Sequence, residues 1–400
     1  MSHDSSAPAH QAQVNSTKGY AQPATPTPSS SAVMISGATL PVHSAPASLP
    51  HDVPNSGPLL DQWGRAATDL RISLTDKCNL RCQYCMPAEG LEWLPQSNLL
   101  SAAEVRRLVN IAVHHMGIEE VRFTGGEPLL RKDLAEIIGS VHADHPRLPI
   151  SITTNGLGLD KHAEKLIAAG LERINVSLDS ICPETFAELT RRDRLHDVLQ
   201  GIDAAARAGL SPIKINAVLM PGINDDQAVE LLQWALREGY QLRFIEQMPL
   251  DADQQWSKER TITAAQIREQ LEGSFVLHQE PGPRGSAPAA LWDVYPLGTE
   301  SFDSAHKLGT VGIIASVTEP FCHTCTRTRL TADGKIRSCL FSAVETDVLE
   351  LLRSDASDED IALRWREAMW AKPAAHGKNS AGFDTTDFVR PTRSMSAIGG

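Results

Sequence analysis

Between residues 70 and 246 the sequence alternates between short apolar runs and amphipathic stretches, and this rhythm constrains the fold more than any other feature. Repeated strand–helix units form parallel sheets with right-handed crossovers. The pattern therefore predicts an α/β fold, and it fits either a doubly wound sheet or an incomplete barrel. The predicted strands are 70–74, 119–124, 149–153, 173–178, 212–219 and 241–246, and the predicted helices are 101–116, 131–143, 160–169, 195–208 and 225–237.

The composition changes at both ends of this rhythm. The first 58 residues contain eleven serines and nine prolines, and Lys18 is their only cation. Such a segment cannot bury enough apolar surface to offset its ordering entropy, so we expect a disordered tail. We expect three parts: this tail at 1–58, an α/β domain at 59–250 and a smaller C-terminal region at 251–400.

The charge balance restricts the classes of partner. The chain has 37 basic and 49 acidic residues, a net charge of −12, which argues against a general nucleic-acid binder. No stretch approaches 18 consecutive apolar residues, so we expect no membrane span. Six of the seven cysteines fall in two groups of three, a pattern typical of intracellular metal binding. We therefore expect a cytoplasmic protein that meets any anionic ligand with a local cluster of Arg or Lys.

The first cysteine group directly follows the first predicted strand. Cys78, Cys82 and Cys85 have the spacing C-x3-C-x2-C, which lets one loop wrap its thiolates around a compact metal centre. Three ligands suit a 4Fe–4S cluster with one open iron. A structural zinc ion would need a fourth ligand, and the nearest histidine, His114, lies in the next predicted helix. The spacing favours iron–sulfur chemistry, with zinc as the alternative.

The eight residues from Cys78 to Cys85, with Tyr84 just before the third cysteine, resemble the signature of radical S-adenosylmethionine (SAM) enzymes. The resemblance implies a 4Fe–4S cluster that binds SAM and cleaves it to a 5′-deoxyadenosyl radical. It also implies an incomplete (β/α)6 TIM-type barrel. The segment 124–128 after the second strand looks like the family's GGE motif. The SAM contacts that the resemblance implies are Tyr84, Gly126, Ser177 and Met248.

The second cysteine group lies in the C-terminal region. Cys322, Cys325 and Cys339 have the spacing C-x2-C-x13-C, and a hairpin turn at 332–335 would bring Cys339 back to the pair. His323 lies inside the C-x2-C span and could serve a zinc ion, so structural zinc stays open here as well. A second cluster with one open iron is the favoured interpretation.

Two arginines follow this pair of cysteines. On a strand, Arg327 and Arg329 would point to the same face. Their mutual repulsion would be offset by a bridging anion, and guanidinium groups suit phosphate oxygens. The pair predicts a triphosphate site, whereas the alternative is a basic strand facing solvent.

Both cysteine groups, this arginine pair and the terminal Gly399-Gly400 together resemble the GTP 3′,8-cyclase family, radical SAM lyases that start molybdenum cofactor biosynthesis. The resemblance implies that the second cluster binds guanine and that the radical removes the ribose 3′ hydrogen. The C3′ radical then attacks C8 of the base, and reduction of the resulting base radical gives (8S)-3′,8-cyclo-7,8-dihydroguanosine 5′-triphosphate. A partner, cyclic pyranopterin monophosphate synthase, would consume this product.

The resemblance also assigns residues and partners. It implies an electron donor, is compatible with a homodimer, and places no catalytic side chain, because SAM and the clusters carry the radical chemistry. It implies that the Gly399-Gly400 tail inserts toward the active site. Two alternatives stay open: a radical SAM enzyme acting on another substrate, such as a peptide, and a non-catalytic iron–sulfur or zinc module. The implied GTP contacts are Arg71, Arg122, Thr153, Lys214, Arg327, Thr328 and Arg329.

Overall fold

The computed structural model describes residues 52–251, 254–279, 282, 284–376, 382–383, 388–391 and 393–399. All of these residues belong to one compact unit that spans 43–400. Most of the predicted tail and Gly400 lie outside the described residues. Within the described part, no helix combines the length and the apolar character that crossing a membrane requires.

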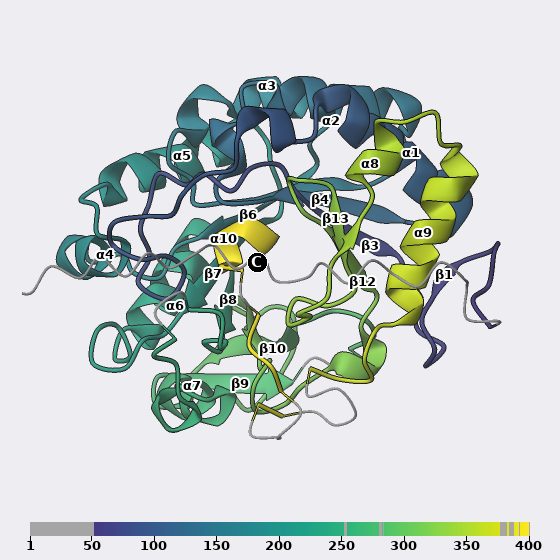
Figure 1. Cartoon of the computed structure of the whole chain (residues 1–400). Helices are drawn as coiled ribbons and strands as arrows, with labels where there is room; N and C mark the ends of the chain where they lie inside the picture. Colours follow the sequence, from purple (N-terminus) through teal and green to yellow (C-terminus); the bar gives the residue numbers. More distant parts are fainter. Residues whose placement is uncertain are drawn as a thin grey trace, which may run out of the picture. The chain divides into compact units, whose positions relative to one another are not determined.

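Six parallel strands form the centre of the fold, and they lie side by side in the order of the sequence (Figure 1). Each of the six predicted strands is confirmed to within one residue at either end. A doubly wound sheet reverses its strand order at a switch point. This sheet has no such reversal, and it is open at both ends, as in an incomplete barrel. The strands are β3 (Asp69–Ser73), β4 (Glu120–Thr124), β5 (Ile150–Thr154), β6 (Arg173–Ser177), β7 (Ile213–Val218) and β8 (Gln241–Ile245).

Helices cover the outer face of this curved sheet (Figure 1). α1 (Ala102–Met116) begins at a capping box formed by Ser101 and Glu104 and buries Val105, Leu108 and Ile111. One further helix, α4 (Pro183–Thr190), was not predicted; it begins where Pro183 occupies the first helical turn. The other outer helices are α2 (Leu134–Asp144), α3 (Ala163–Ala168), α5 (Leu195–Arg207) and α6 (Ala228–Glu238), and the short 3-10 turns are η1 (Gln96–Asn98), η2 (Pro128–Leu130) and η3 (Leu159–Lys161).

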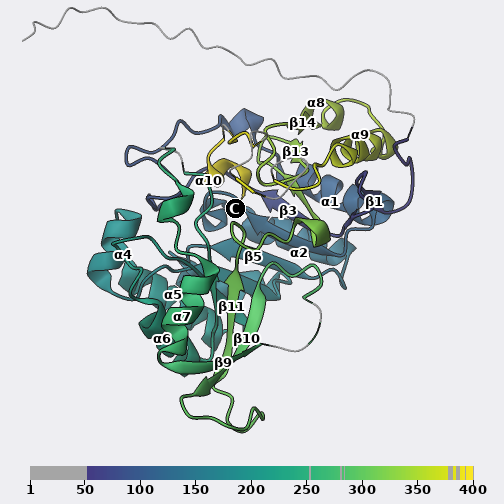
Figure 2. The same cartoon turned by 90° about the horizontal axis from the view of Figure 1, so that it is seen from below.

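The C-terminal region extends the same sheet at both edges. Figure 2 shows β9, β10 and β11 together at one edge and β13 and β14 near the other. β11 (Gly309–Ile314) pairs parallel with β8, and β10 (Ala290–Pro296) and β9 (Phe275–Gln279) continue antiparallel. β12 (Arg327–Leu330) pairs parallel with β3, followed by β13 (Lys335–Arg337) and β14 (Thr346–Asp347). The predicted hairpin turn is confirmed between β12 and β13.

A short hairpin and four further helices complete the described fold. A short hairpin of β1 (Leu59–Leu60) and β2 (Ala66–Ala67) packs beside α9 (Figure 1). The last helix, α10, lies on the inner side of the curved sheet (Figure 1). The helices of the C-terminal region are α7 (Ala264–Glu272), α8 (Leu349–Leu352), α9 (Asp358–Trp370) and α10 (Met395–Ile398), with 3-10 turns η4 (Lys258–Arg260) and η5 (Cys322–Thr324).

Candidate active site

The first cysteine group lies in the loop after β3, at the carboxyl end of the parallel strands. Cys78, Cys82 and Cys85 line one pocket, and the predicted residues Tyr84, Gly126 and Ser177 line it too. The structure therefore brings three of the four predicted SAM contacts to these cysteines. The remaining lining residues are Leu80, Thr124, Gly125, Thr153, Thr154, Asn155, Met395 and Ser396.

The glycine pair is required because the β4 loop packs directly on the cysteine loop. A Cβ atom on Gly125 would lie 2.3 Å from the Thr75 carbonyl oxygen, and one on Gly126 would lie 2.2 Å from that of Lys77. The Gly126 amide donates to the Thr75 carbonyl at 2.7 Å, and the Glu127 amide donates to the Lys77 carbonyl at 2.7 Å. Any side chain would push the two loops apart.

Glu127, which follows the glycine pair, is fully buried and joins this loop to the end of β5. Its carboxylate accepts hydrogen bonds from the Asn155 amide at 2.7 Å, the Thr154 hydroxyl at 2.6 Å and the Leu129 amide at 2.9 Å. Burial raises the pKa of Glu127 to about 7 despite these donors. Asn155 in turn donates to Asn79 at 2.7 Å, so the carboxylate supports the cysteine loop indirectly.

Tyr84 is anchored by an acid that the sequence analysis did not single out. Its hydroxyl donates to Asp179 at 2.8 Å, and the other carboxylate oxygen of Asp179 accepts from the Val218 amide at 2.8 Å. Burial raises the pKa of Asp179 to about 6. Asp179 follows β6, so this contact fastens the cysteine loop to the carboxyl end of a central strand.

The chemistry of the first cysteine group fits a metal cluster. Burial raises the pKa of Cys85 to about 12 and raises that of Cys82 well above the ordinary thiol value. Thiolates at these positions would therefore require compensation by nearby positive charge, which the iron of a cluster would supply. Among the described residues, no three His, Cys, Asp or Glu side chains are arranged to hold a single metal ion.

The second cysteine group lines a second pocket. Cys322, Cys325 and Cys339 border it, and Thr153 is common to both pockets. Five of the seven predicted GTP contacts line this pocket: Thr153 of β5 and, from three adjacent strands, Arg71, Arg122, Arg327 and Arg329. Predicted residues from distant parts of the chain thus meet at one place. The other lining residues are Asn216, Ile245, Met248, Pro288, Ile314, Ser316, Pro320, Phe321, Ser338, Leu340, Phe341 and His376.

Three predicted contacts are placed differently from the rest. Met248, a predicted SAM contact, borders the second pocket and not the first. Thr328 lies between the two arginines of β12, so its side chain alternates to the other face, where its hydroxyl accepts from the Trp365 indole at 2.9 Å. Lys214 on β7 lines neither pocket, but the positive charges of Arg243 and Arg122 act on it.

Arg71 and Arg122 of this pocket repel one another and also the nearby Lys214 and Arg243, which do not line it. Burial and Arg71 lower the pKa of Arg122 to about 10, and burial with Arg122 and Arg71 lowers that of Arg243 to about 9. Burial and Arg243 lower the pKa of Lys214 to about 8. In the described part of the chain, the only ion pair formed by these four is Arg71 with Asp69, at 3.2 Å. Uncompensated buried charge of this kind stabilises a bound anion.

Arg243 was missed by the sequence analysis. It lies on β8, and it is 7% exposed. One of its terminal nitrogens donates to Asn175 at 2.5 Å, whereas its Nε has no hydrogen-bond partner among the described residues. A lone arginine in an apolar strand carries no spacing signal, so only the fold reveals that it joins the other cations.

The C-terminal tail reaches both cysteine pockets. Met395 and Ser396 of α10 line the first pocket, and the buried Arg329 guanidinium donates to the Gly399 carbonyl. A Cβ atom on Gly399 would lie 2.5 Å from the Ser73 hydroxyl. The tail prediction also named Gly400, which lies outside the described residues.

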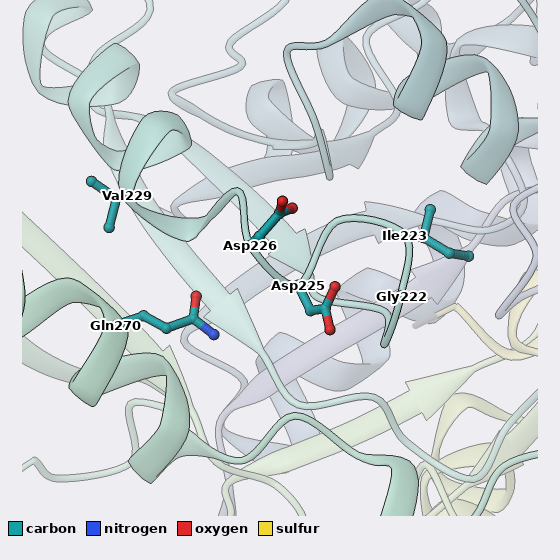
Figure 3. A pocket seen from close by; sticks show the side chains of 6 residues that line it. All are labelled: Gly222, Ile223, Asp225, Asp226, Val229 and Gln270. Carbon is teal, nitrogen blue, oxygen red and sulfur yellow. The ribbon is translucent and has the colours of Figure 1, made fainter.

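A separate hollow lies between the β7–α6 loop and α7 (Figure 3). Figure 3 shows Gln270 of α7 facing the loop that carries Asp225 and Asp226. Its lining contains neither cysteine nor cation, so it does not contribute to the site described above. The complete lining is Gly222, Ile223, Asp225, Asp226, Val229 and Gln270.

Comparisons with known proteins agree with this arrangement. A family model described as the radical SAM superfamily matches residues 72–235, and one described as Molybdenum Cofactor Synthesis C matches 240–378. The chain is 60% identical over 343 residues to a GTP 3′,8-cyclase of Paenarthrobacter nicotinovorans, covering 86% of this chain and 97% of that relative. The chain belongs to the GTP 3′,8-cyclase family.

Two more relatives of this family have similar coverage. The GTP 3′,8-cyclase of Mycolicibacterium smegmatis is 58% identical, over 87% of this chain and 93% of its own length. That of Streptomyces coelicolor is 56% identical, over 86% of this chain and 96% of its own length. The family membership therefore extends across both cysteine groups.

Solved structures support the fold. Streptococcus suis SuiB bound to S-adenosylmethionine has a TM-score of 0.53 at 16% identity, covering 76% of this chain and 67% of that one. Native anSMEcpe with bound AdoMet has a TM-score of 0.50 at 14% identity, covering 81% and 93%. The shared architecture is the open radical SAM sheet, which confirms the predicted incomplete barrel.

Proposed function

We propose that this chain catalyses the SAM-dependent cyclisation of GTP to (8S)-3′,8-cyclo-7,8-dihydroguanosine 5′-triphosphate, the first step of molybdenum cofactor biosynthesis. The observation that carries the proposal is the group of buried, mutually repelling cations beside the second cysteine group. Relatives that are 56–60% identical bear the name of this enzyme. A triphosphate supplies the negative charge that these cations lack.

The first cysteine group would hold a 4Fe–4S cluster through Cys78, Cys82 and Cys85. When bound, this cluster supplies the electron that starts radical chemistry on SAM. The chain's own contribution is to hold SAM: Gly126 offers backbone polar groups without a side chain, and Ser177 offers a hydroxyl at the end of β6. Tyr84 would be fixed in place by its hydrogen bond to Asp179.

The second cysteine group would hold another 4Fe–4S cluster through Cys322, Cys325 and Cys339, next to the base of GTP. Arg71, Arg122 and Arg329 would bind the triphosphate, together with Lys214, Arg243 and Arg327. These groups stand on a rigid sheet, so the nucleotide is oriented without a moving loop. Thr153, which borders both pockets, would lie between nucleotide and SAM. Met248 would border the nucleotide, whereas Thr328 would hold β12 in place through its hydrogen bond with Trp365.

The carbonyl of Gly399 lies at Arg329, so the tail would close one side of the nucleotide site. An external electron donor would reduce the clusters, and cyclic pyranopterin monophosphate synthase would take up the product. We place the enzyme in the cytoplasm, where GTP and SAM are available. An assembly as a homodimer is compatible with the proposal and is not required by it.

The test is an anaerobic assay with SAM, dithionite and GTP, in which 5′-deoxyadenosine and the cyclised nucleotide are quantified by mass spectrometry. Two clusters predict about eight iron atoms per chain and little zinc. Cys82→Ala should abolish SAM cleavage. Cys325→Ala should abolish cyclisation but still form some 5′-deoxyadenosine.

The matched control is Cys182→Ala, because Cys182 belongs to neither group and its thiol donates to Glu184 at 3.2 Å. This variant should keep both products and the full iron content. Intact cyclisation in Cys325→Ala would contradict the role of the second group, and zinc in place of iron would contradict the radical mechanism.

A further inference from the structure

A buried lysine contacts the second cysteine group. Lys372 follows α9 and is 2% exposed. Its ammonium nitrogen lies 3.4 Å from the sulfur of Cys325, 3.3 Å from the carbonyl oxygen of Cys325 and 3.0 Å from that of Arg327. The sequence analysis assigned no role to this residue, since a lone lysine after a helix carries no spacing signal.

The ammonium group of Lys372 has an acceptor for each of its N–H groups, but none of these acceptors is a carboxylate. An ammonium group has three N–H donors, and the three acceptors just named match them one for one. Among the described residues, no carboxylate forms an ion pair with Lys372. A buried cation without a counter-charge is costly. Of its three acceptors in the described part of the chain, only the Cys325 sulfur can carry a negative charge, which it would carry as a metal-bound thiolate.

The Cys325 sulfur receives a second charged donor. Arg327 donates from its Nε to the same sulfur at 3.3 Å. No lysine or arginine side chain in the described part of the chain donates to the sulfur of Cys322 or Cys339. The three ligands of the second group are therefore not equivalent, because the positive donors converge on one of them.

The position of Lys372 is fixed by the hairpin of β1 and β2, which precedes β3 in the sequence. The indole of Trp63 donates to the Lys372 carbonyl at 3.1 Å. Arg65 donates to the Cys322 carbonyl at 2.7 Å and to the carbonyls of the next two residues after Lys372, Pro373 at 2.6 Å and Ala374 at 2.7 Å. One hairpin thus holds both the lysine segment and the cysteine segment.

We propose that Lys372 is a positioning residue that tunes the second cluster by donating a charged hydrogen bond to the Cys325 sulfur. The inference rests on the proposed function, since it requires a cluster at this site. Hydrogen bonds to cysteine sulfur withdraw electron density and help set the cluster's reduction potential. Reduction adds negative charge, which the ammonium group stabilises. Removal of Lys372 should therefore shift the midpoint potential of the second cluster to more negative values.

The experiment is a redox titration of the full chain with both clusters, followed by electron paramagnetic resonance. Lys372→Met keeps the length of the side chain and removes its charge. We expect at least a tenfold change in the reduction equilibrium of the second cluster, or about 59 mV for one electron, and no shift in the first. Lys372→Arg should restore most of the potential. Lys335→Met is the matched control, because Lys335 lies on the nearby β13 but pairs with Asp347 at 3.2 Å.

The iron content separates the possible outcomes. About four iron atoms in the parent chain would contradict the second cluster itself, and hence the proposed function. With about eight iron atoms, an unchanged potential in Lys372→Met overturns the tuning role. Loss of the second cluster in Lys372→Met but not in Lys372→Arg supports the requirement for a cationic donor. Its loss in both variants overturns the inference, since the position would then serve packing alone.

Discussion

The guanidinium group of Arg329 donates a hydrogen bond to the carbonyl of Gly399, seventy residues further along the chain. Arg329 lies on β12 directly opposite Arg71 of β3, and it is 5% exposed. Burial, Arg71 and Arg327 lower the pKa of Arg329 well below its usual value. A backbone carbonyl offsets the buried charge of Arg329 only in part, because a carbonyl is polar but uncharged. The described part of the tail, which ends at Gly399, therefore contributes a polar carbonyl to the cation group and no negative charge.

Gly399→Ala tests whether the tail must reach this position. The residue has a φ of +69°, and an added Cβ would lie 2.5 Å from the Ser73 hydroxyl and 2.6 Å from the Thr124 methyl carbon. We expect a large loss of cyclisation with unchanged iron content and thermal stability. Gly298→Ala is the control, because Gly298 has a similar φ of +79° but open space around it. Equal product yields in both variants would contradict the active-site role of the tail.

Glu127→Gln tests the pH dependence that burial of Glu127 imposes. Burial raises its pKa from 4.5 to about 7, so the folded chain holds a proton that the unfolded chain releases. Stability should therefore fall as the pH rises from about 4.5 to about 7 and then stay constant. Glutamine does not titrate, so denaturant unfolding of the metal-free proteins should show a smaller fall for the variant. Parallel stability curves between pH 5 and pH 8 would refute this assignment.

The sequence predicted those parts of the molecule that carry a local pattern. The six central strands follow from apolar runs, and the cysteine loop follows from its spacing and from its position after a strand. The arginine pair on β12 could be found because alternate residues of a strand share a face. The structure places both arginines at the second cysteine pocket.

Other parts of the site have no local pattern. Arg243, Asp179 and Lys372 are single residues whose roles depend on partners from distant segments. The pairing of β12 with β3 joins residues 327–330 to 69–72, and no periodicity encodes a contact of that sequence separation. Thr328 shows the converse: its position between two arginines suggests a shared role, but strand alternation turns its hydroxyl toward Trp365.

Two truncations test where the N-terminal tail stops contributing. The composition of residues 1–58 predicts that the whole segment can be deleted without effect, but the structure describes residues 52–58 and places Gly57 and Pro58 against Arg366. We therefore expect deletion of residues 1–51 alone to leave thermal stability and turnover nearly unchanged. Deletion of residues 1–58 should cost about 2 kcal/mol or more of unfolding free energy, because hydrogen bonds to charged groups are lost. The buried Arg366 donates to the carbonyls of Gly57 and, at 3.0 Å, Pro58. Denaturant unfolding of both proteins makes the comparison, and equal stabilities would show that these two contacts contribute nothing.

Arg65→Met tests the link between the N-terminal hairpin and the second cysteine group. Arg65 pairs with Asp61 at 2.6 Å and donates to three carbonyls, including that of Cys322, so its loss should cost about 3 kcal/mol or more. We also expect the iron content to fall toward the value of one cluster, because η5 and the Lys372 segment lose their common support.

Arg366→Met is the matched control: Arg366 is a buried arginine that also donates to backbone carbonyls but contacts neither cysteine group. It should lose comparable stability and keep both clusters. Iron analysis and denaturant unfolding of the two variants decide the matter, and full iron content in Arg65→Met would show that the hairpin stabilises the fold without supporting the second cluster.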